Sequence, residues 1–257
     1  MSFLKRLKKI HVEPYSRIAE IYDAVMRHVN YPQWADYIES LFRRHAPVVP
    51  VNLLDVACGT GTLACELTLR GYSVVGVDAS ETMIQQARVK AVRQGVNGHF
   101  TRLRMTDLGD LGQFDAILCL YDSINYLCVP EDVEATLLNI YRLLRSDGLF
   151  IFDICTERNS LLYFRDWTER ERTDRAEYVR HSSYDPKTRT QTNRFDIHFT
   201  GEEATIVETH RQRIYAEKEL RRFIARTSFT VVAAYDGFSF NPASEETSDR
   251  IHFVLQK

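Results

Sequence analysis

The 257-residue sequence lacks the features that would assign it at once to a membrane, metal-binding or nucleic-acid-binding class. No apolar run approaches the roughly 20 residues needed to cross a bilayer, and no apolar core of a signal peptide is present. No two cysteines form a Cys-x-x-Cys pair, so we predict no metal site. The formal net charge is only −2, so no global field draws the protein to nucleic acid or to an anionic membrane.

Cysteine is scarce as well. The five cysteines are an odd number and lie mostly inside apolar segments, which is typical of reduced thiols and predicts a cytoplasmic protein. The basic run Lys5–Lys9 is the local exception to the balanced charge, and we interpret it as a solvated or frayed end. With 44% hydrophobic residues in a chain of this length, one large α/β domain with an insertion is expected.

The most informative segment begins with the apolar strand Leu53–Val56, which contains Asp55. Gly59 and Gly61 follow at once, then an amphipathic segment, and then a second strand that ends at Asp78. This order predicts a β-α-β unit with a ligand over the strand tips, because glycine allows a ligand to approach the backbone and permits positive φ. Asp78 lies about 20 residues beyond the turn, where such units place an acid on a ribose diol. The pattern therefore indicates an adenosine-containing cofactor.

Two cofactors fit the turn, because residues 59–64 (Gly-Thr-Gly-Thr-Leu-Ala) also match the loose dinucleotide pattern G-x-G-x-x-G/A. Asp55 decides against NAD, since an acid four residues before Gly59 would repel a pyrophosphate. The same acid would attract a ligand that carries an ammonium group and a sulfonium. The string D-x-x-C-G-T-G that begins at Asp55 resembles motif I of the class I S-adenosylmethionine-dependent methyltransferases.

That resemblance continues along the chain in the family's order and implies a set of cofactor residues. In the family, an acid equivalent to Asp78 holds the ribose hydroxyls, the methionine that follows contacts adenine, and a later acid, here Asp107, accepts from the adenine amine. The cofactor is then S-adenosyl-L-methionine and the product S-adenosyl-L-homocysteine. The implied cofactor-binding residues are Tyr15, Tyr22, Trp34, Asp55, Ala57, Cys58, Gly59, Thr60, Gly61, Asp78, Ala79, Met83, Thr106, Asp107, Leu108, Leu120 and Tyr121.

The amino-terminal segment supplies the aromatic members of this set. Its pattern Y-x-x-I-A-x-x-Y-D, starting at Tyr15 and followed by Y-P-x-W at Tyr31, looks like the cap of small-molecule methyltransferases. The resemblance is to glycine N-methyltransferase and to the N,N-dimethyltransferases of amino sugars. In those relatives a cap aromatic covers the cofactor and a tyrosine hydroxyl can bond its methionyl carboxylate.

A second distinctive region separates two parts of the core. Residues 178–184, 189–200 and 204–215 alternate like exposed strands, and Asp185-Pro186-Lys187 and Gly201-Glu202 supply turns. We predict a three-stranded antiparallel sheet that roofs the active site and holds the acceptor. Its apolar side must be covered, either by the core or by a second subunit, so a homodimer is one possibility.

These elements predict an α/β fold: a Rossmann-like seven-stranded sheet, its last strand antiparallel, with an inserted small antiparallel sheet. The predicted division is an amino-terminal helical cap at 1–48, a cofactor-binding core at 49–154 and 215–257, and the inserted sheet at 155–214. The antiparallel last strand is the topology of this methyltransferase class and differs from that of NAD folds.

The predicted activity is methyl transfer by in-line displacement to an N or O nucleophile of a small molecule. The [DN]-P-P-[FYW] motif of enzymes that methylate base amines does not follow the fourth strand, and no basic domain for RNA is appended. His198, His210, Asp122 and Tyr126 are placed where a base would work, but the sequence assigns no catalytic residue. An NAD-dependent oxidoreductase and a non-catalytic S-adenosylmethionine-binding module remain as alternatives.

Overall fold

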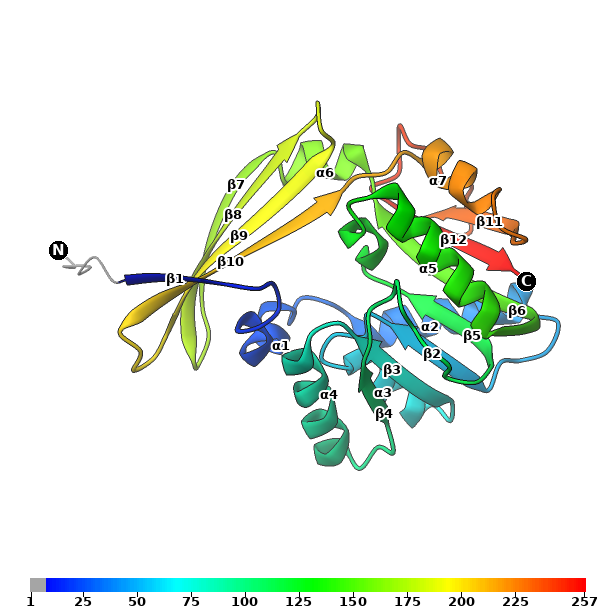
Figure 1. Cartoon of the computed structure of the whole chain (residues 1–257), viewed down its shortest axis with the longest axis horizontal. Coiled ribbons are helices and arrows are strands. Elements are labelled where there is room, and N and C mark those ends of the chain that lie inside the picture. The colour runs from blue at the N-terminus through cyan, green and yellow to red at the C-terminus, as the bar shows by residue number, and fades with distance from the viewer. Residues whose placement is uncertain (1–7) are drawn as a thin grey trace.

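Two β-sheets that share no strand organise the molecule, and Figure 1 shows them side by side. The computed structural model describes residues 8–257. The larger sheet has seven strands in the order β11-β12-β6-β5-β2-β3-β4, and the smaller has five in the order β1-β10-β9-β8-β7. Within the described residues, no helix is long and apolar enough to span a bilayer.

The seven-stranded sheet is parallel except at one end. Its strands are β2 (Asn52–Val56), β3 (Ser73–Asp78), β4 (His99–Arg102), β5 (Phe114–Cys119), β6 (Leu144–Cys155), β11 (Thr230–Asp236) and β12 (Arg250–Gln256). The last strand, β12, runs antiparallel to both β6 and β11. The predicted fold class is confirmed.

Helices cover both faces of this sheet, because its central strands are apolar on both sides. α2 (Tyr31–His45), α3 (Thr62–Leu69) and α4 (Glu81–Gln94) pack in one apolar core. α5 (Pro130–Leu143) and α7 (Glu217–Ile224) pack in the other. From β2 the chain continues to β3 on one side, whereas β5 lies on the other. Such a reversal leaves a crevice beyond the carboxyl ends of the strands.

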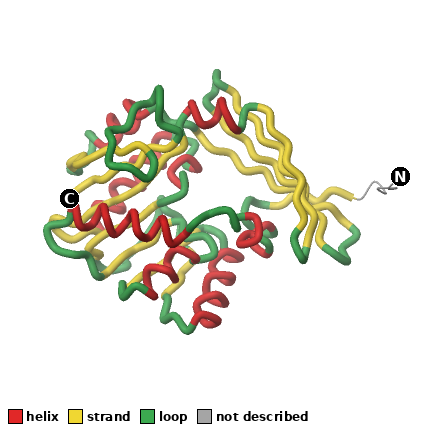
Figure 2. The backbone as a smooth tube through the Cα atoms, turned by 180° about the vertical axis from the view of Figure 1, so that it is seen from behind, coloured by secondary structure: helices red, strands yellow, loops and turns green. Residues whose placement is uncertain are grey.

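The five-stranded sheet, which we call the roof, extends to one side of this core (Figure 2). β7 (Asp166–Arg172), β8 (Ala176–Asp185), β9 (Thr190–Phe199) and β10 (Ala204–Arg213) form an antiparallel meander reached through α6 (Glu157–Tyr163). β1 (Lys8–Val12) adds a parallel edge strand beside β10. The prediction of three strands was therefore incomplete.

Both additional strands escaped the sequence pattern for physical reasons. β7 reads Asp-Trp-Thr-Glu-Arg-Glu-Arg and lacks apolar alternation. β1 belongs to the predicted helical cap, yet its Ile10 pairs with Ile206 on β10, which is far away in the sequence. Of the interpretation of the basic run as a solvated or frayed end, only the frayed part is wrong for Lys8 and Lys9. Both are exposed, but they belong to β1, and Lys9 Nζ lies 2.8 Å from Asp196 Oδ2. The run's first residues, 5–7, lie outside the described part of the chain.

The apolar part of the roof is covered by its own chain. We call residues 15–45 the cap; it contains η1 (Ile18–Glu20), α1 (Tyr22–Val25) and α2. Ile18 and Ile21 of the cap form one apolar cluster with Tyr178, Ile197 and Phe199 of the roof. The sequence left open whether the core or a second subunit covers the apolar side of the roof. In the structure the cap of the same chain covers it.

A buried carboxylate completes the junction between cap and roof. Glu208 on β10 is 0% exposed and accepts the backbone N–H groups of Tyr15, Arg17 and Ile18 at 2.7, 2.7 and 2.8 Å. Burial alone would raise the pKa of this carboxyl group, but the hydrogen bond from His210 and the cap N–H groups lower it overall. Glu208 is therefore an ionised anchor for the start of the cap.

Three glycines make room for one aromatic ring in the core. A Cβ on Gly61, Gly76 or Gly98 would come within 2.9 Å of the Phe100 ring on β4. Gly61 also has φ +70° and lies at the amino end of α3. Gly61 was predicted to admit a ligand to the backbone; the structure instead places it against Phe100.

We therefore predict that Gly61→Ala lowers stability by roughly 1–3 kcal/mol more than Gly71→Ala. Gly71 has φ +99°, but a Cβ at this position would meet no atom within 4 Å, so it controls for backbone strain alone. Urea unfolding of both variants measures the difference. A Cβ on Gly61 would also lie 2.9 Å from Ala87 Cβ, so equal losses would show that Phe100 and Ala87 both move aside without cost.

Candidate active site

A cavity of about 710 Å³ lies where the core, the cap and the roof meet. The strand ends of the core line one part, and the inner face of the roof lines the other. Most of the predicted cofactor residues lie around it: Tyr15, Tyr22, Trp34, Asp55, Ala57, Cys58, Gly59, Thr60, Asp78, Ala79, Met83, Leu120 and Tyr121.

The turn after β2 forms the floor of the core part. Gly59 has φ +56°, and its N–H donates to Asp78 Oδ2 at 3.0 Å. The other oxygen of Asp78 accepts the Ser80 N–H at 2.8 Å, at the start of α4. Asp78 is thereby fixed between the glycine turn and a helix start. Each oxygen keeps a lone pair for a further donor such as a hydroxyl.

Two acids give this part of the cavity its charge. Asp55 is 4% exposed. Burial, followed by the charge of Asp78, raises the pKa of Asp55 to about 7. Burial also raises the pKa of Asp78, although the N–H groups of Ser80 and Gly59 oppose this. A cationic ligand relieves the repulsion between two such carboxylates, whereas a pyrophosphate would add to it.

The cap lies directly over the glycine turn. Tyr22 Cε1 lies 3.8 Å from where a Cβ on Gly59 would be. Asp23, on α1, accepts from Thr60 Oγ1 at 2.6 Å and from Lys90 Nζ at 2.8 Å. These contacts hold the cap against the turn.

Tyr15 joins both parts of the cavity. Its backbone is left-handed, with φ +61°, and its carbonyl accepts from Ser80 Oγ at 2.7 Å. Its hydroxyl donates to the Tyr126 hydroxyl at 2.5 Å, beneath the roof. A non-glycine residue in this conformation is strained. Tyr15 therefore depends on its contacts with Ser80 and Glu208 at either end.

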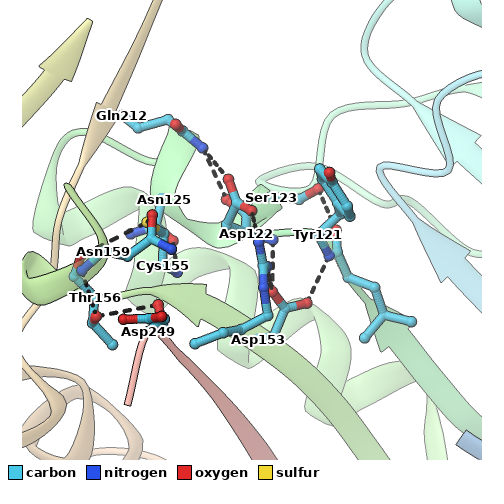
Figure 3. Close-up of polar contacts among 12 residues, drawn as sticks. Tyr121, Asp122, Ser123, Asn125, Asp153, Cys155, Thr156, Asn159, Gln212 and Asp249 are labelled. Atoms are coloured by element: carbon cyan, nitrogen blue, oxygen red, sulfur yellow. Dashed lines mark hydrogen bonds and ion pairs between the residues drawn. The ribbon is translucent and has the colours of Figure 1, made fainter. Parts of the chain in front are cut away.

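The exit of β5 is held by an ion cluster that sequence reasoning missed. Tyr121 and Asp122 both have positive φ, and Asp153 on β6 accepts their N–H groups at 2.6 and 2.9 Å (Figure 3). Arg250 on β12 pairs with both Asp122 and Asp153. Although burial opposes its charge, the two carboxylates raise the pKa of Arg250. The sequence did contain one indication of this cluster: Asp153 is an acid inside the apolar run Leu149–Ile154.

Four predicted positions do not line the cavity: Gly61, Thr106, Asp107 and Leu108. A bridge between Arg104 and Asp107 turns this segment, leaving Asp107 exposed and Leu108 buried in the core. Met105 lines the cavity in this region.

The roof lines the cavity mainly with uncharged polar side chains and with acids that are paired with arginines. Gln191, Asn193, His210 and Gln212 on β9 and β10 are all nearly buried and line the cavity. Gln212 Nε2 donates to Asp122 Oδ2 at 2.5 Å, so the roof is tied to the exit of β5 (Figure 3). The lining acids Glu169 and Glu171 pair with Arg180 and Arg27 at 2.9 and 2.7 Å.

The candidate bases separate into two groups. Asp122, Tyr126 and His210 line the cavity. His198 does not, because it lies on the opposite face of β9 from Asn193, with its Nδ1 3.4 Å from the Ala204 carbonyl oxygen. The alternating sequence of β9 predicts that His198 lies on the polar face of the strand, and the structure places it there.

The seven-stranded topology and the acid-lined turn define a Rossmann-like methyltransferase fold, and comparison with known proteins agrees. Residues 53–148 match the family model described as "Methyltransferase domain". A Geobacillus sp. (strain WCH70) protein provisionally named a methyltransferase is 31% identical over 248 residues, covering 95% of this chain and 99% of that protein.

Solved structures show the same fold across the whole chain. An S-adenosylmethionine-dependent methyltransferase from Clostridium acetobutylicum superposes with a TM-score of 0.79 at 24% identity, covering 93% and 97% of the two chains. The sugar N-methyltransferase KedS8 from Streptoalloteichus gives 0.77 at 16% identity, covering 99% of each. The chain belongs to the class I S-adenosylmethionine-dependent methyltransferases. It is an enzyme of that family, not an NAD-dependent oxidoreductase.

The raised pKa of Asp55 predicts a stability cost in the protein without cofactor. A carboxyl group whose folded pKa lies above its unfolded value loses folding stability as pH rises from about 4 through about 7. Asp55→Asn should therefore be more stable than the wild type at pH 8, by roughly 2–4 kcal/mol, and should lose that advantage near pH 4.

Urea unfolding at both pH values measures this, with exposed Asp174→Asn in the β7–β8 turn as the control. The same Asp55 variant should bind S-adenosylmethionine more weakly, since its ammonium loses a charged partner. If Asp55→Asn and Asp174→Asn are equally stable at pH 8, the ionised Asp55 carboxylate does not destabilise the folded protein.

Proposed function

We propose that the protein transfers a methyl group from S-adenosylmethionine to an N or O nucleophile of a small polar molecule by in-line displacement. One observation carries the proposal: a single cavity contains both the acid-lined glycine turn and the amide-rich face of the roof. The turn would hold the cofactor, and the roof face of the same cavity would hold the acceptor.

Within this proposal, the chain's own groups hold the cofactor. Asp78 accepts from the ribose hydroxyls, Asp55 attracts the ammonium group, and Met83 contacts adenine. When bound, the cofactor supplies a sulfonium that is already an activated leaving group. The protein then has to hold the nucleophile in line and exclude water, and the cap and roof enclose the cavity for this purpose.

The size of the cavity supports a small acceptor. A volume of about 710 Å³ falls within the range of about 300–1,000 Å³ that holds one drug-sized ligand, and cofactor and acceptor must share it. The lining acids Glu169 and Glu171 are paired with arginines. The oxygen of the Asn193 amide accepts from Ser182 Oγ at 2.6 Å, so its nitrogen is the group left to donate to an acceptor. An acceptor with several hydroxyl or amine groups fits this lining best.

Two assays test the proposed function. In thermal shift, S-adenosylmethionine and S-adenosylhomocysteine should raise the melting temperature and NAD should not. Turnover against amino sugars, amino acids, phenols and a metabolite extract, measured as S-adenosylhomocysteine release, then tests catalysis. Cofactor binding with no release from any mixture would favour a non-catalytic module. The five unpaired cysteines support a cytoplasmic location, which fractionation of the cells would test.

We predict that Asp78→Ala weakens S-adenosylmethionine binding about ten- to a hundredfold. Hydrogen bonds to a charged acceptor contribute roughly 1.5–3 kcal/mol each. Asp107→Ala is the matched control, because the structure leaves Asp107 outside the cavity lining. Isothermal calorimetry measures both affinities. Unchanged affinity in a folded Asp78→Ala variant would remove Asp78 from the cofactor site, and a loss from Asp107→Ala would restore the family's adenine contact.

The roof generates a separate prediction. Asn193→Ala should raise KM for the acceptor about tenfold and leave cofactor affinity within about twofold, since Asn193 lines only the roof side. Its neighbour Thr192 points to the other face of β9, so Thr192→Ala should change neither value. Steady-state kinetics and calorimetry separate the two effects. Weaker cofactor binding by Asn193→Ala would place the roof in the cofactor site.

A further inference from the structure

His210 lies between an acid and a hydroxyl group at the wall of the cavity. Its ring is 2% exposed, and its Nε2 lies 3.2 Å from Glu208 Oε2. On the other side, Nδ1 lies 3.5 Å from the hydroxyl of Tyr126, a residue that lines the cavity. The three side chains come from β10 and from η2 (Ser123–Tyr126).

The acid fixes which nitrogen can accept a proton. Glu208 is an ionised acceptor, so it orients the imidazole with Nε2–H toward itself. Nδ1 then carries the lone pair and faces Tyr126. An acid that holds an imidazole tautomer in this way also stabilises the imidazolium that forms when Nδ1 is protonated.

Tyr15 sets the direction of the next hydrogen bond. Its hydroxyl donates to the Tyr126 oxygen at 2.5 Å. The hydroxyl hydrogen of Tyr126 is thus left to point toward His210 Nδ1. The cap provides this arrangement, because Glu208 Oε2 also accepts the backbone N–H of Tyr15 at 2.7 Å.

We propose that His210 takes up, through the Tyr126 hydroxyl, the proton that the acceptor nucleophile loses during methyl transfer, with Glu208 as the positioning residue. This inference rests on the proposed function. It adds a proton acceptor to an activity for which the sequence assigned none.

The step balances in atoms and charge. A lone pair on the acceptor nitrogen or oxygen forms the new bond to the methyl carbon, and the electron pair of the carbon–sulfur bond stays on sulfur. The nucleophile's proton passes to the Tyr126 oxygen while the hydroxyl proton of Tyr126 passes to Nδ1. The positive charge lost at sulfur reappears on the imidazolium beside Glu208.

The first test requires no acceptor. ¹⁵N NMR of the full-length protein saturated with S-adenosylhomocysteine reports the protonation of each histidine nitrogen, and His210→Gln assigns the relevant signals. We expect a protonated Nε2 and a lone pair on Nδ1. A proton on Nδ1 of the neutral ring would overturn the proposal, because that nitrogen then has nothing to accept with. Glu208→Gln keeps the shape and removes the charge, and should abolish the single tautomer.

The second test compares two nucleophiles. Iodide carries no proton, whereas any amine or hydroxyl acceptor found in the turnover assay does. His210→Gln should lower transfer to the proton-bearing acceptor about 10²-fold and leave transfer to iodide within about twofold. His198→Gln, on the outer face of the roof, is the matched control and should change neither. Equal losses with both nucleophiles would mean that His210 is only structural, and no loss with either would also overturn the proposal.

The outcomes distinguish this inference from the proposed function. If the wild type binds no S-adenosylmethionine and releases no product, the proposed function fails. If the wild type transfers methyl groups and His210→Gln does so equally well, only the relay fails.

Discussion

The carboxylate of Glu208 is the constraint on which the architecture of the cavity depends. It is buried on a roof strand beside His210, yet three of its hydrogen-bond donors belong to the cap: the backbone N–H groups of Tyr15, Arg17 and Ile18. An ionised group in such a place is stable only when several donors surround it. The first residues of the cap therefore supply the N–H groups that stabilise the Glu208 carboxylate. From there Tyr15 reaches the cofactor loop through Ser80, so one buried charge brings roof, cap and core around a common space.

Charge is handled differently in the two parts of that space. At the β5 exit, Arg250 forms ion pairs with both Asp122 and Asp153, and these contacts support two residues with left-handed backbone. Near the glycine turn, burial and then the charge of Asp78 raise the pKa of Asp55 to about 7. The protein thus pairs the charges that maintain its shape. The repulsion it leaves uncompensated lies where a cationic ligand is expected.

Local patterns predicted the β-α-β unit and its acids, because these depend on neighbouring residues, and the family resemblance supplied most of the other lining residues. Asp55, Gly59 and Asp78 are close in sequence and close in space. The missed features depend on long-range pairing. β1 beside β10, Arg250 beside Asp153, and Gly61 against Phe100 each join segments that no periodicity connects. Asp107 is implied by the family pattern alone, and in the structure it is exposed at the Arg104 turn, outside the cavity lining.

The pairing of Tyr15 with Glu208 spans 193 residues of sequence and has a consequence for the order of assembly. Chains emerge from the ribosome amino end first, and contacts between distant segments form slowly because a long loop must close. The first strands of the core can pair while the cap still has no anchor. The enclosed space is therefore among the last features to appear, after β10 has been made. In a nascent chain the glycine turn would therefore be exposed to solvent until β10 has been synthesised.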